Sequence, residues 1–173
     1  MIKIIVMFLL VLSLKADNGT LIKVVDGDTL NFKTNGKTVK CRIEYIDTPE
    51  SSNNRKNKKD VKNCKDVSSK DLVGAGKSAT RYAKSLLKLK SKYEYHVNGK
   101  DRYKRSICVV ELSKDTTFNE QMILGGYAVP YRQYMNNSEL KYYESLLDIA
   151  KSNNAGLWKD RYEVIKCLDT ARR

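Results

Sequence analysis

Residues 19–46 alternate apolar and polar side chains so regularly that few folds are open to this part of the chain. Two tight-turn sequences, Asp26-Gly27 and Asn35-Gly36, interrupt the alternation. A period of two residues is typical of strands with one buried face, and Asp-Gly or Asn-Gly pairs are strong hairpin signals. The segment therefore predicts three strands that are connected by tight turns. Its apolar positions are Leu21, Ile22, Val24, Val25, Leu30, Phe32, Val39, Cys41 and Ile43.

The rest of the chain adds two strands and three helices. Strands are expected over 93–97 and about 105–112, with a turn at Asn98-Gly99 between them. Apolar residues recur at helical spacing in three further segments, over 71–90, 118–124 and about 136–153. Five strands and three helices in this order indicate a small α+β domain with an antiparallel sheet.

Two segments are predicted to lie outside these elements. Segment 51–70 is rich in Ser, Asn and Lys, which predicts a long and mobile basic loop. Such a loop could guide an anionic strand toward a site, or it could serve solubility alone, and both interpretations stay open. Residues 159–173 are expected to form a C-terminal tail.

Residues 1–16 have the pattern of a signal peptide. Lys3 supplies a positive start, residues 4–14 form an apolar run, and cleavage is expected after the small residue Ala16. The run is shorter than the ~20 apolar residues that span a bilayer, although an uncleaved anchor stays open. The mature chain, 17–173, is therefore expected to be a single secreted or periplasmic domain without stable membrane insertion.

Charge and cysteine content limit the partners and the compartment. The chain has 33 Lys and Arg residues against 20 Asp and Glu residues, a formal net charge of +13. This excess favours nucleic acid or an anionic membrane as partner over a merely soluble basic protein. Four Cys in an exported chain predict two disulfides, with four free thiols as the alternative. A Cys/His zinc site is not expected, because there is no Cys-x-x-Cys pair and the lone His96 lies on the polar face of a predicted strand.

Four carboxylates and one arginine gather in a short stretch of this basic chain: Asp26, Asp28, Arg42, Asp47 and Glu50. Each has an ordinary explanation alone, because Asp-Gly and Thr-Pro are common turn sequences and an Arg can be solvated on a strand. Together they exceed what turns require. Carboxylates are ligands that Ca²⁺ prefers, and Arg neutralises charge that grows on a reacting phosphate. The set therefore predicts a hard-cation site beside a phosphate site.

The pattern continues in further motifs along the chain. Asp26-Gly27-Asp28-Thr29, Arg42 and Asp47-Thr48-Pro49-Glu50 are followed by Asp101-Arg102-Tyr103-Lys104-Arg105, Phe118-Asn119-Glu120, Gly126-Tyr127-Ala128 and Gly156-Leu157-Trp158. In these motifs the chain resembles the staphylococcal nuclease (thermonuclease) family, over roughly residues 18–160. The resemblance implies an α+β fold built on a five-stranded OB-fold barrel with three helices. Such barrels bind nucleic-acid strands on one face.

The resemblance also implies a role for each acidic residue. Asp28 and Asp47 would ligate Ca²⁺ by carboxylate, and Thr48 would do so by its backbone carbonyl. Asp26 would lie behind these ligands and hold a ligand water. Glu50 would act through a metal-associated water, either as the general base or as an orienting group.

By the same resemblance, the substrate contacts would come from two arginines and four further side chains. Arg42 and Arg105 would grip the scissile phosphate, because each guanidinium offers two parallel donors. Arg102 and Tyr103 would contact the terminal phosphate and nucleotide, and Tyr131 and Tyr134 would stack on a base. For these last two tyrosines, packing against the last predicted helix stays open. The chain departs from the family at Lys104, where Gly is usual, so a turn that needs φ > 0 there would be strained.

The resemblance thus implies an exported, monomeric, Ca²⁺-dependent phosphodiesterase that hydrolyses DNA and RNA. Little sequence specificity is expected, because phosphate contacts and stacking carry little sequence information. A non-catalytic OB-fold nucleic-acid-binding module is the first alternative, although such a module should lack some of the site residues. A surface adhesin or structural Ca²⁺ module is the second alternative, and it would leave Arg42 and Arg105 without a task.

The implied barrel also suggests how the cysteines pair. It places the strand that carries Arg42 beside the strand that carries Arg105, about 4.8 Å apart. If both arginines face the phosphate site, strand alternation turns Cys41 and Cys108 to the opposite side. The expected bridges are Cys41–Cys108 and Cys64–Cys167.

Overall fold

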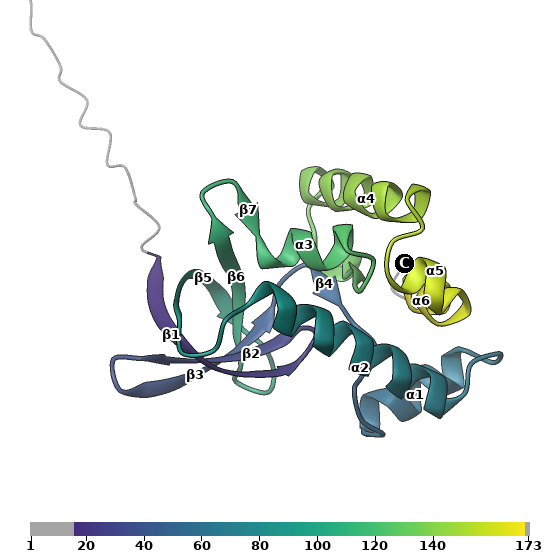
Figure 1. Cartoon of the computed structure of the whole chain (residues 1–173), viewed down its shortest axis with the longest axis horizontal. Helices are drawn as coiled ribbons and strands as arrows, with labels where there is room; N and C mark the ends of the chain where they lie inside the picture. Colours follow the sequence, from purple (N-terminus) through teal and green to yellow (C-terminus); the bar gives the residue numbers. More distant parts are fainter. Residues whose placement is uncertain (1–15, 172–173) are drawn as a thin grey trace, which may run out of the picture.

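A closed barrel forms the body of the protein in the computed structural model, which describes residues 16–171. The predicted signal peptide, 1–16, lies outside these residues except for Ala16. The long strands are β1 Asp17–Asp26, β2 Thr29–Thr34, β3 Lys37–Ile43, β5 Lys92–Lys100 and β6 Ser106–Ser113 (Figure 1). They are hydrogen-bonded in the order β3-β2-β1-β5-β6, and β3 also pairs with β6. This last pair is parallel and closes the five-stranded mixed barrel that the resemblance implies.

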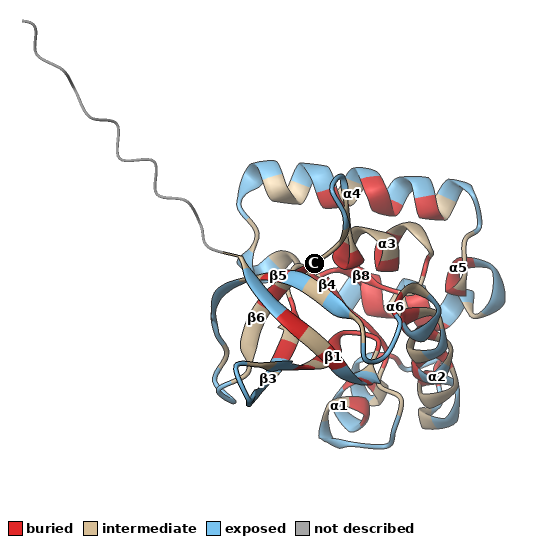
Figure 2. Ribbon diagram, turned by 60° about the vertical axis from the view of Figure 1, so that its left-hand side comes forward, coloured by how far each residue is buried: buried red, intermediate tan, exposed pale blue. Residues whose placement is uncertain are grey.

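The alternation of residues 19–46 fills the inside of this barrel. Leu21, Leu30 and Phe32 are fully buried, and Figure 2 shows buried segments in red along the strands of the barrel. Tyr95 of β5 stacks on Phe32, with ring centroids 5.0 Å apart. The hairpin turn between β2 and β3 has φ values of 50° at Asn35 and 77° at Gly36, as a tight turn of this kind requires. The three predicted strands and their two turns are therefore confirmed.

Three helices coincide with the predicted ones: α2 Ser69–Leu86, α3 Phe118–Leu124 and α4 Asn137–Ser152. Side chains cap all three helices at the N-terminus, which satisfies backbone N–H groups that have no partner within the helix. Ser68 caps α2, and Thr117 and Asn136 each form a capping box with the Glu three residues later. In Figure 1 the barrel lies on the left and the helices on the right.

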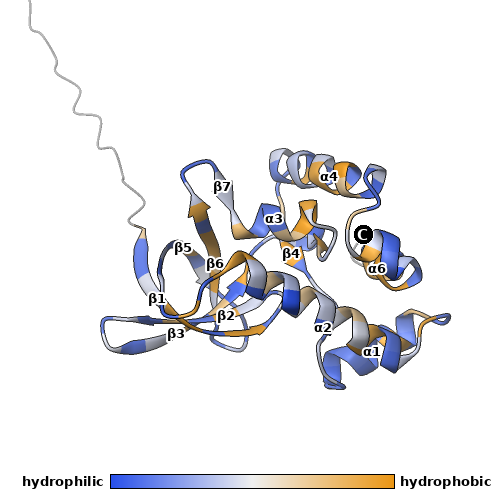
Figure 3. Ribbon diagram, viewed as in Figure 1, coloured by the Kyte–Doolittle hydropathy of each residue, from blue (hydrophilic) through white to orange (hydrophobic). Residues whose placement is uncertain are grey.

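The structure has six α-helices within residues 16–171, whereas the sequence predicted three. Segment 51–70, predicted as a mobile loop, contains α1 Arg55–Asn63. This helix was missed because its buried residues, Asn57 and Asp60, are polar and leave no apolar stripe to recognise; its ribbon is mostly hydrophilic in Figure 3.

The predicted tail, 159–173, is also helical for most of its length. It contains the end of α5 Leu157–Asp160 and all of α6 Tyr162–Ala171. Val164, Ile165 and Leu168 of α6 are buried, so this helix packs on the body of the protein. Spacing of three and four residues between these apolar positions was the available signal.

The turn between β5 and β6 also differs from the prediction. Asn98 and Gly99, expected to form it, lie within β5, where the register shifts between Val97 and Gly99. Gly99 has φ of 152°, so its freedom serves a β-bulge instead of a turn. The chain reverses a few residues later, at 101–105.

Both expected disulfides are present. Cys41–Cys108 joins β3 to β6 across the seam that closes the barrel, with a Cα–Cα distance of 5.5 Å. Cys64–Cys167 joins the end of α1 to α6, with a Cα–Cα distance of 5.8 Å. Within residues 16–171, no helix has both the length and the apolar character needed to cross a bilayer.

Candidate active site

Three separate segments bring the central site residues together. Asp28 lies in the turn between β1 and β2, Arg42 lies near the end of β3, and Asp47 ends the short strand β4 Ile46–Asp47. Nη2 of Arg42 lies 3.4 Å from Oδ2 of Asp28 and 3.1 Å from Oδ1 of Asp47. One guanidinium nitrogen therefore touches both of the carboxylates that the sequence assigned to a metal.

Close packing fixes the Asp28 carboxylate. A Cβ at Gly27 would lie 2.9 Å from Cγ2 of Thr48, so this turn has no room for a side chain there. The backbone N–H of Thr48 donates to Oδ2 of Asp28 at 3.2 Å, and the Thr29 hydroxyl donates to Oδ1 at 3.1 Å. Asp28 is 4% exposed, so these partners set its orientation.

Helix α2 approaches the backbone of Glu50 at Gly76. A Cβ at Gly76 would lie 2.2 Å from the carbonyl oxygen of Glu50, so only glycine allows the helix to lie this close. The carboxylate of Glu50 accepts a hydrogen bond from the side chain of Asn54, the residue that caps α1. The sequence analysis missed this positioning role of Gly76, although a glycine inside a helical pattern signals close packing.

Charge and burial shift the pKa values of Asp26 and Asp28 in opposite directions. Burial, then Asp28 and Glu50, raise the pKa of Asp26 to about 7. Burial alone would also raise the pKa of Asp28, but Arg42 and then Lys56 outweigh burial and hold that pKa below its ordinary value. At neutral pH the site thus contains an ionised Asp28 paired with Arg42, while the surroundings of Asp26 disfavour its ionisation.

Lys56, in the first turn of α1, is a site residue that the sequence analysis missed. Its Nζ donates to the carbonyl oxygen of Thr48 at 3.0 Å. The same Nζ lies 3.2 Å from Oε1 of Glu50, 3.3 Å from Oδ2 of Asp60 and 3.4 Å from Oδ2 of Asp47. Its spacing of four residues from Asp60 is typical of a helical ion pair, but the segment was interpreted as a loop.

A second group of predicted residues lies in the turn between β5 and β6. Asp101 organises this turn: its Oδ1 accepts hydrogen bonds from the backbone N–H groups of Tyr103 and Arg105 at 2.9 Å each. Its Oδ2 accepts from Nε of Arg105 at 2.8 Å. Lys104 has φ of 63°, so the left-handed position that the family fills with Gly is kept here with Lys. The guanidinium of Arg102 lies over the Tyr103 ring, 4.9 Å from its centroid.

The barrel seam relates this turn to Arg42. In the parallel pairing of β3 with β6, Arg42 lies opposite Ile107. Arg105 precedes Ile107 by two residues and lies just before β6 begins, so strand alternation would direct it toward the face of Arg42. In the structure Arg105 is bound to Asp101, whereas Arg42 is bound to Asp28 and Asp47.

The two predicted stacking tyrosines lie beside Arg42. The guanidinium carbon of Arg42 is 5.9 Å from the centroid of the Tyr131 ring. Tyr134, in the short 3₁₀ helix η1 Arg132–Tyr134, is 5.6 Å from Tyr131 between ring centroids and is 72% exposed. Tyr134 thus presents an aromatic surface to solvent next to the charged site.

The oxygens at the site fit a hard cation in kind. The Asp28 carboxylate, the Asp47 carboxylate and the Thr48 carbonyl are all oxygen donors, the type that Ca²⁺ requires. Each of these oxygen-bearing groups already contacts a cationic side chain of the protein. Arg42 contacts both carboxylates, and Lys56 donates to the Thr48 carbonyl. Within residues 16–171, however, no three His, Cys, Asp or Glu side chains lie together as a ready-made metal site.

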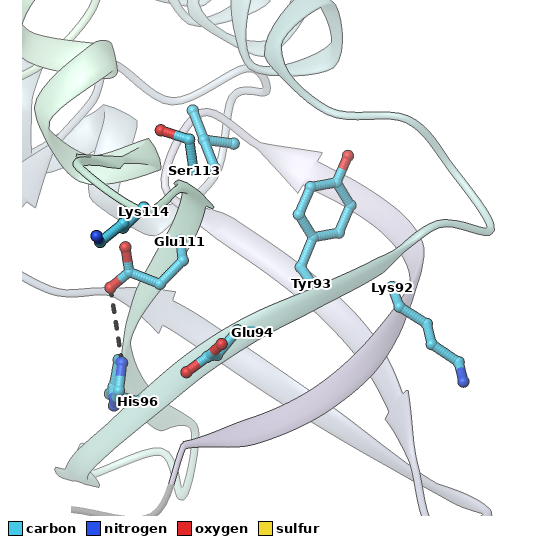
Figure 4. A pocket seen from close by; sticks show the side chains of 8 residues that line it. Lys92, Tyr93, Glu94, His96, Glu111, Ser113 and Lys114 are labelled. Carbon is cyan, nitrogen blue, oxygen red and sulfur yellow. Dashed lines mark ion pairs between the residues drawn. The ribbon is translucent and has the colours of Figure 1, made fainter.

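His96 lies outside this site, as its position in the sequence predicted. A surface hollow between β5 and β6 is lined by His96 and Glu111, whose Nε2 and Oε1 atoms lie 3.6 Å apart (Figure 4). Its other lining residues include Lys92, Tyr93 and Lys114. None of these residues belongs to the predicted site.

Comparison with known proteins identifies relatives over much of the chain. A family model described as "Staphylococcal nuclease homologue" matches residues 40–160. An uncharacterized protein of Methanocaldococcus jannaschii is 32% identical over 151 residues, which cover 81% of this chain and 70% of that protein. An "uncharacterized endonuclease" of Haemophilus influenzae is 34% identical over 142 residues, 80% of this chain and 65% of that protein. A "thermonuclease" of Staphylococcus hyicus is 33% identical over 108 residues, 62% of this chain and 55% of that protein.

Most of the predicted site residues lie within the range that the family model matches. The matched range of 40–160 includes Arg42, Asp47, Glu50 and Arg105. Asp28 precedes this range, but in the folded protein its carboxylate contacts Arg42. The chain belongs to the staphylococcal nuclease family.

Proposed function

We propose that the protein is an exported, Ca²⁺-dependent nuclease that hydrolyses phosphodiester bonds of DNA and RNA with little sequence specificity. The contact of Arg42 with both Asp28 and Asp47 carries this proposal. It supports the proposal because a guanidinium, which can bind phosphate with two parallel donors, lies directly beside oxygens of the kind that hard cations prefer. A simple binding module needs the positive charge but has no use for the buried carboxylates.

Three groups of this chain would hold the metal: the carboxylates of Asp28 and Asp47 and the carbonyl of Thr48. Bound Ca²⁺ would polarise the phosphate and neutralise charge that develops on it. Asp26 would support these ligands from behind, since it is half-buried beside Asp28 and its Oδ1 accepts a hydrogen bond from the backbone N–H of Asp28.

Arg42 and Glu50 would do the chemistry at the phosphate. Arg42 presents parallel donors that match phosphate oxygens and stabilise the charge of the transition state. Glu50 would accept a proton from the attacking water or orient that water, and the hydrogen bond from Asn54 fixes its carboxylate for either role. Arg105 would join Arg42 on the phosphate by exchanging its bond to Asp101 for one to the substrate.

The nucleotide would bind beside these groups. Tyr131 and Tyr134 form an aromatic surface next to Arg42 on which bases can stack, and Arg102 and Tyr103 extend the contacts from the neighbouring turn. The net charge of +13 attracts the phosphate backbone regardless of sequence. Two disulfides support an oxidising compartment outside the cytoplasm, where Ca²⁺ is abundant, and we propose that the protein acts there as a monomer.

Cleavage assays test this proposal. The purified protein is incubated with single- and double-stranded DNA and RNA, in Ca²⁺ or in EGTA, beside an Arg42→Ala variant purified in parallel to control for contaminating nucleases. Cleavage of all four substrates is expected in Ca²⁺ and is expected to stop in EGTA. Full cleavage in EGTA would contradict the metal assignment, and binding without cleavage under every divalent cation would favour a non-catalytic module.

A further inference from the structure

Lys56 places a positive charge among the oxygens assigned to the metal. Its Nζ contacts the Thr48 carbonyl and the carboxylates of Asp47 and Glu50, at 3.0, 3.4 and 3.2 Å. We infer that Lys56 is a built-in competitor of the divalent cation, which binds only when the Lys56 ammonium leaves these oxygens. The inference rests on the proposed metal site.

The shared oxygens make the two cations mutually exclusive. The Thr48 carbonyl and Asp47 are common to the contacts of Lys56 and to the proposed ligand set. Ca²⁺ needs its oxygens at about 2.3–2.6 Å, which leaves no room for an ammonium that donates to the same atoms. Repulsion between a divalent ion and an ammonium at this distance adds to the steric conflict.

Helix α1 holds Lys56 firmly in this place. Asn54 caps the start of the helix, and Cys64 at its end is cross-linked to Cys167 of α6. Between them Asn57 is 1% exposed and accepts a hydrogen bond from the Ser69 hydroxyl at 2.7 Å. Because both ends and the middle of α1 are fixed, the fold keeps the backbone of Lys56 beside these oxygens, and only its side chain has to move when the ammonium leaves.

Asp60 gives the displaced ammonium a second partner. Asp60 lies one helical turn after Lys56, is 1% exposed, and has its Oδ2 3.3 Å from Nζ. It belongs to α1 and is not among the proposed metal ligands. Lys56 can therefore leave Thr48 and Asp47 by a rotation of its long side chain while it keeps the ion pair with Asp60, so the exchange does not require α1 to unfold.

Metal titration of matched variants tests the competition. Lys56→Met removes the competing ammonium, whereas Lys59→Met removes the same charge from an exposed position of the same helix. Ca²⁺ affinity is measured by calorimetric titration of the full-length protein without nucleic acid. Lys56→Met is expected to bind Ca²⁺ at least about tenfold more tightly than the unmodified protein does. Lys59→Met is expected to stay within about twofold, because an exposed charge is screened.

A measurement on the unmodified protein covers the case that Lys56→Met does not fold. An amine-reactive acetylating ester is applied with EGTA or with saturating Ca²⁺, and the modification of each lysine is read by peptide mass spectrometry. Lys56 is expected to react faster in Ca²⁺ because its ammonium has been released, while Lys59 reacts equally in both conditions.

The outcomes separate the inference from the proposed function. If Ca²⁺ binds with equal affinity to both variants, or if Lys56 labelling does not change while Ca²⁺ is bound, the competition is wrong and the metal site stands. If neither the unmodified protein nor Lys56→Met binds Ca²⁺, the metal site itself is wrong and the inference fails with it. Binding that appears only in Lys56→Met supports the inference in its strongest form.

Discussion

Arg42 is the side chain on which most of the site depends. Its guanidinium contacts Asp28 and Asp47, lies beside the Tyr131 ring, and donates to the Ile43 carbonyl at 2.6 Å. Only a planar group with several fixed donors can make these contacts together.

Replacing Arg42 by Lys is therefore expected to be a severe change. Arg42→Lys keeps the charge but loses the parallel donors, so cleavage should fall by about 10² or more, and nucleotide binding should weaken as well. Initial rates and nucleotide titrations measure both effects, with exposed Arg81→Lys as the control. Near-normal activity of Arg42→Lys would contradict the phosphate role of Arg42.

Glu50 is expected to affect turnover without affecting affinity. Glu50→Gln keeps the size of the side chain but removes its ability to take a proton, so turnover should fall by about 10²–10⁴. Nucleotide binding should change little, because Glu50 is proposed to act on water and not on the substrate. A loss of binding as large as the loss of turnover would assign Glu50 to substrate contact instead.

At this scale the sequence grouped Asp28, Arg42 and Asp47, which the structure brings into contact, but it did not include Lys56. The interval between Asp28 and Arg42 is set by one strand hairpin, so it can be recognised without a structure. Lys56 could not be assigned, because its contacts depend on where α1 packs and the helix carries no apolar pattern. The orientation of the Arg105 side chain could not be predicted either. It depends on the hydrogen bond from Arg105 to Asp101 and on the turn conformation, in which Lys104 has φ of 63°.

Among the elements, η1, α4 and α6 are joined by one cluster of charges around the buried Asp169. Arg132 of η1 donates to Asp169 of α6 at 2.6 Å and also bonds Glu144 of α4. Lys151 of α4 donates to the other carboxylate oxygen of Asp169 at 2.9 Å. The cluster fixes the segment that carries Tyr131 and Tyr134 against the last two long helices.

Removing Asp169 should give a pH-dependent loss of stability. Burial alone would raise the pKa of Asp169, but bonds from Lys151 and Arg132 outweigh it and hold the pKa below its ordinary value. Because this pKa is lower in the folded than in the unfolded state, the ionised Asp169 carboxylate stabilises the folded protein fully above about pH 4. The stabilisation is lost as the pH falls through the folded-state pKa. Asp169→Asn should therefore cost about 3 kcal/mol at pH 7, and less at pH 3.

Denaturant unfolding at pH 7 and pH 3 measures this difference. Asp148→Asn, at an exposed position of α4, serves as the control and should change stability little at either pH. A deficit of Asp169→Asn that is the same at both pH values would show that the carboxylate charge does not contribute.

The disulfides also act between elements, and their removal should be costly. Peptide mapping without reductant should recover Cys41–Cys108 and Cys64–Cys167 peptides. In the chain-entropy model, replacing Cys64 and Cys167 by Ser should lower the free energy of unfolding by about 4 kcal/mol or less. A Cys41–Cys64 peptide would contradict both the strand order and the pairing.

Three helices were predicted from an apolar stripe, and two others were missed for different reasons. The helices α2, α3 and α4 have such stripes and matching caps. Helix α1 is held by buried Asn57 and Asp60 and by Cys64, whose spacing is helical but whose buried members are polar, and α6 was missed although Val164, Ile165 and Leu168 have helical spacing. The β5–β6 turn was predicted at the wrong place, because Asn98-Gly99 is a good turn sequence. In the structure these two residues form a β-bulge within β5.

For the whole molecule, the charge of +13 should govern how binding responds to salt. Each phosphate that the protein neutralises releases counterions, so the affinity for DNA should fall at least about tenfold between 50 and 200 mM salt. Fluorescence titrations with catalytically impaired Glu50→Gln measure this dependence without cleavage of the probe. An affinity that does not change with salt would contradict phosphate-based recognition.

Closure of the barrel is the whole-molecule feature that local sequence does not contain. The alternation of residues 19–46 predicts three strands, but the parallel pairing of β3 with β6 joins segments far apart in the chain. The resemblance to a known family supplied that pairing, and the Cys41–Cys108 bridge, expected from the same barrel, is present across the seam.

The two bridges interleave along the chain, because Cys64 lies between Cys41 and Cys108 while Cys167 lies beyond them. Every peptide bond between residues 41 and 167 is therefore enclosed by at least one covalent loop. A protease that nicks the oxidised protein once anywhere in this span cannot release a fragment, and Arg42 and Arg105 stay tethered to one another. Only reduction or a second cut frees a piece, which suits a protein proposed to work among extracellular proteases.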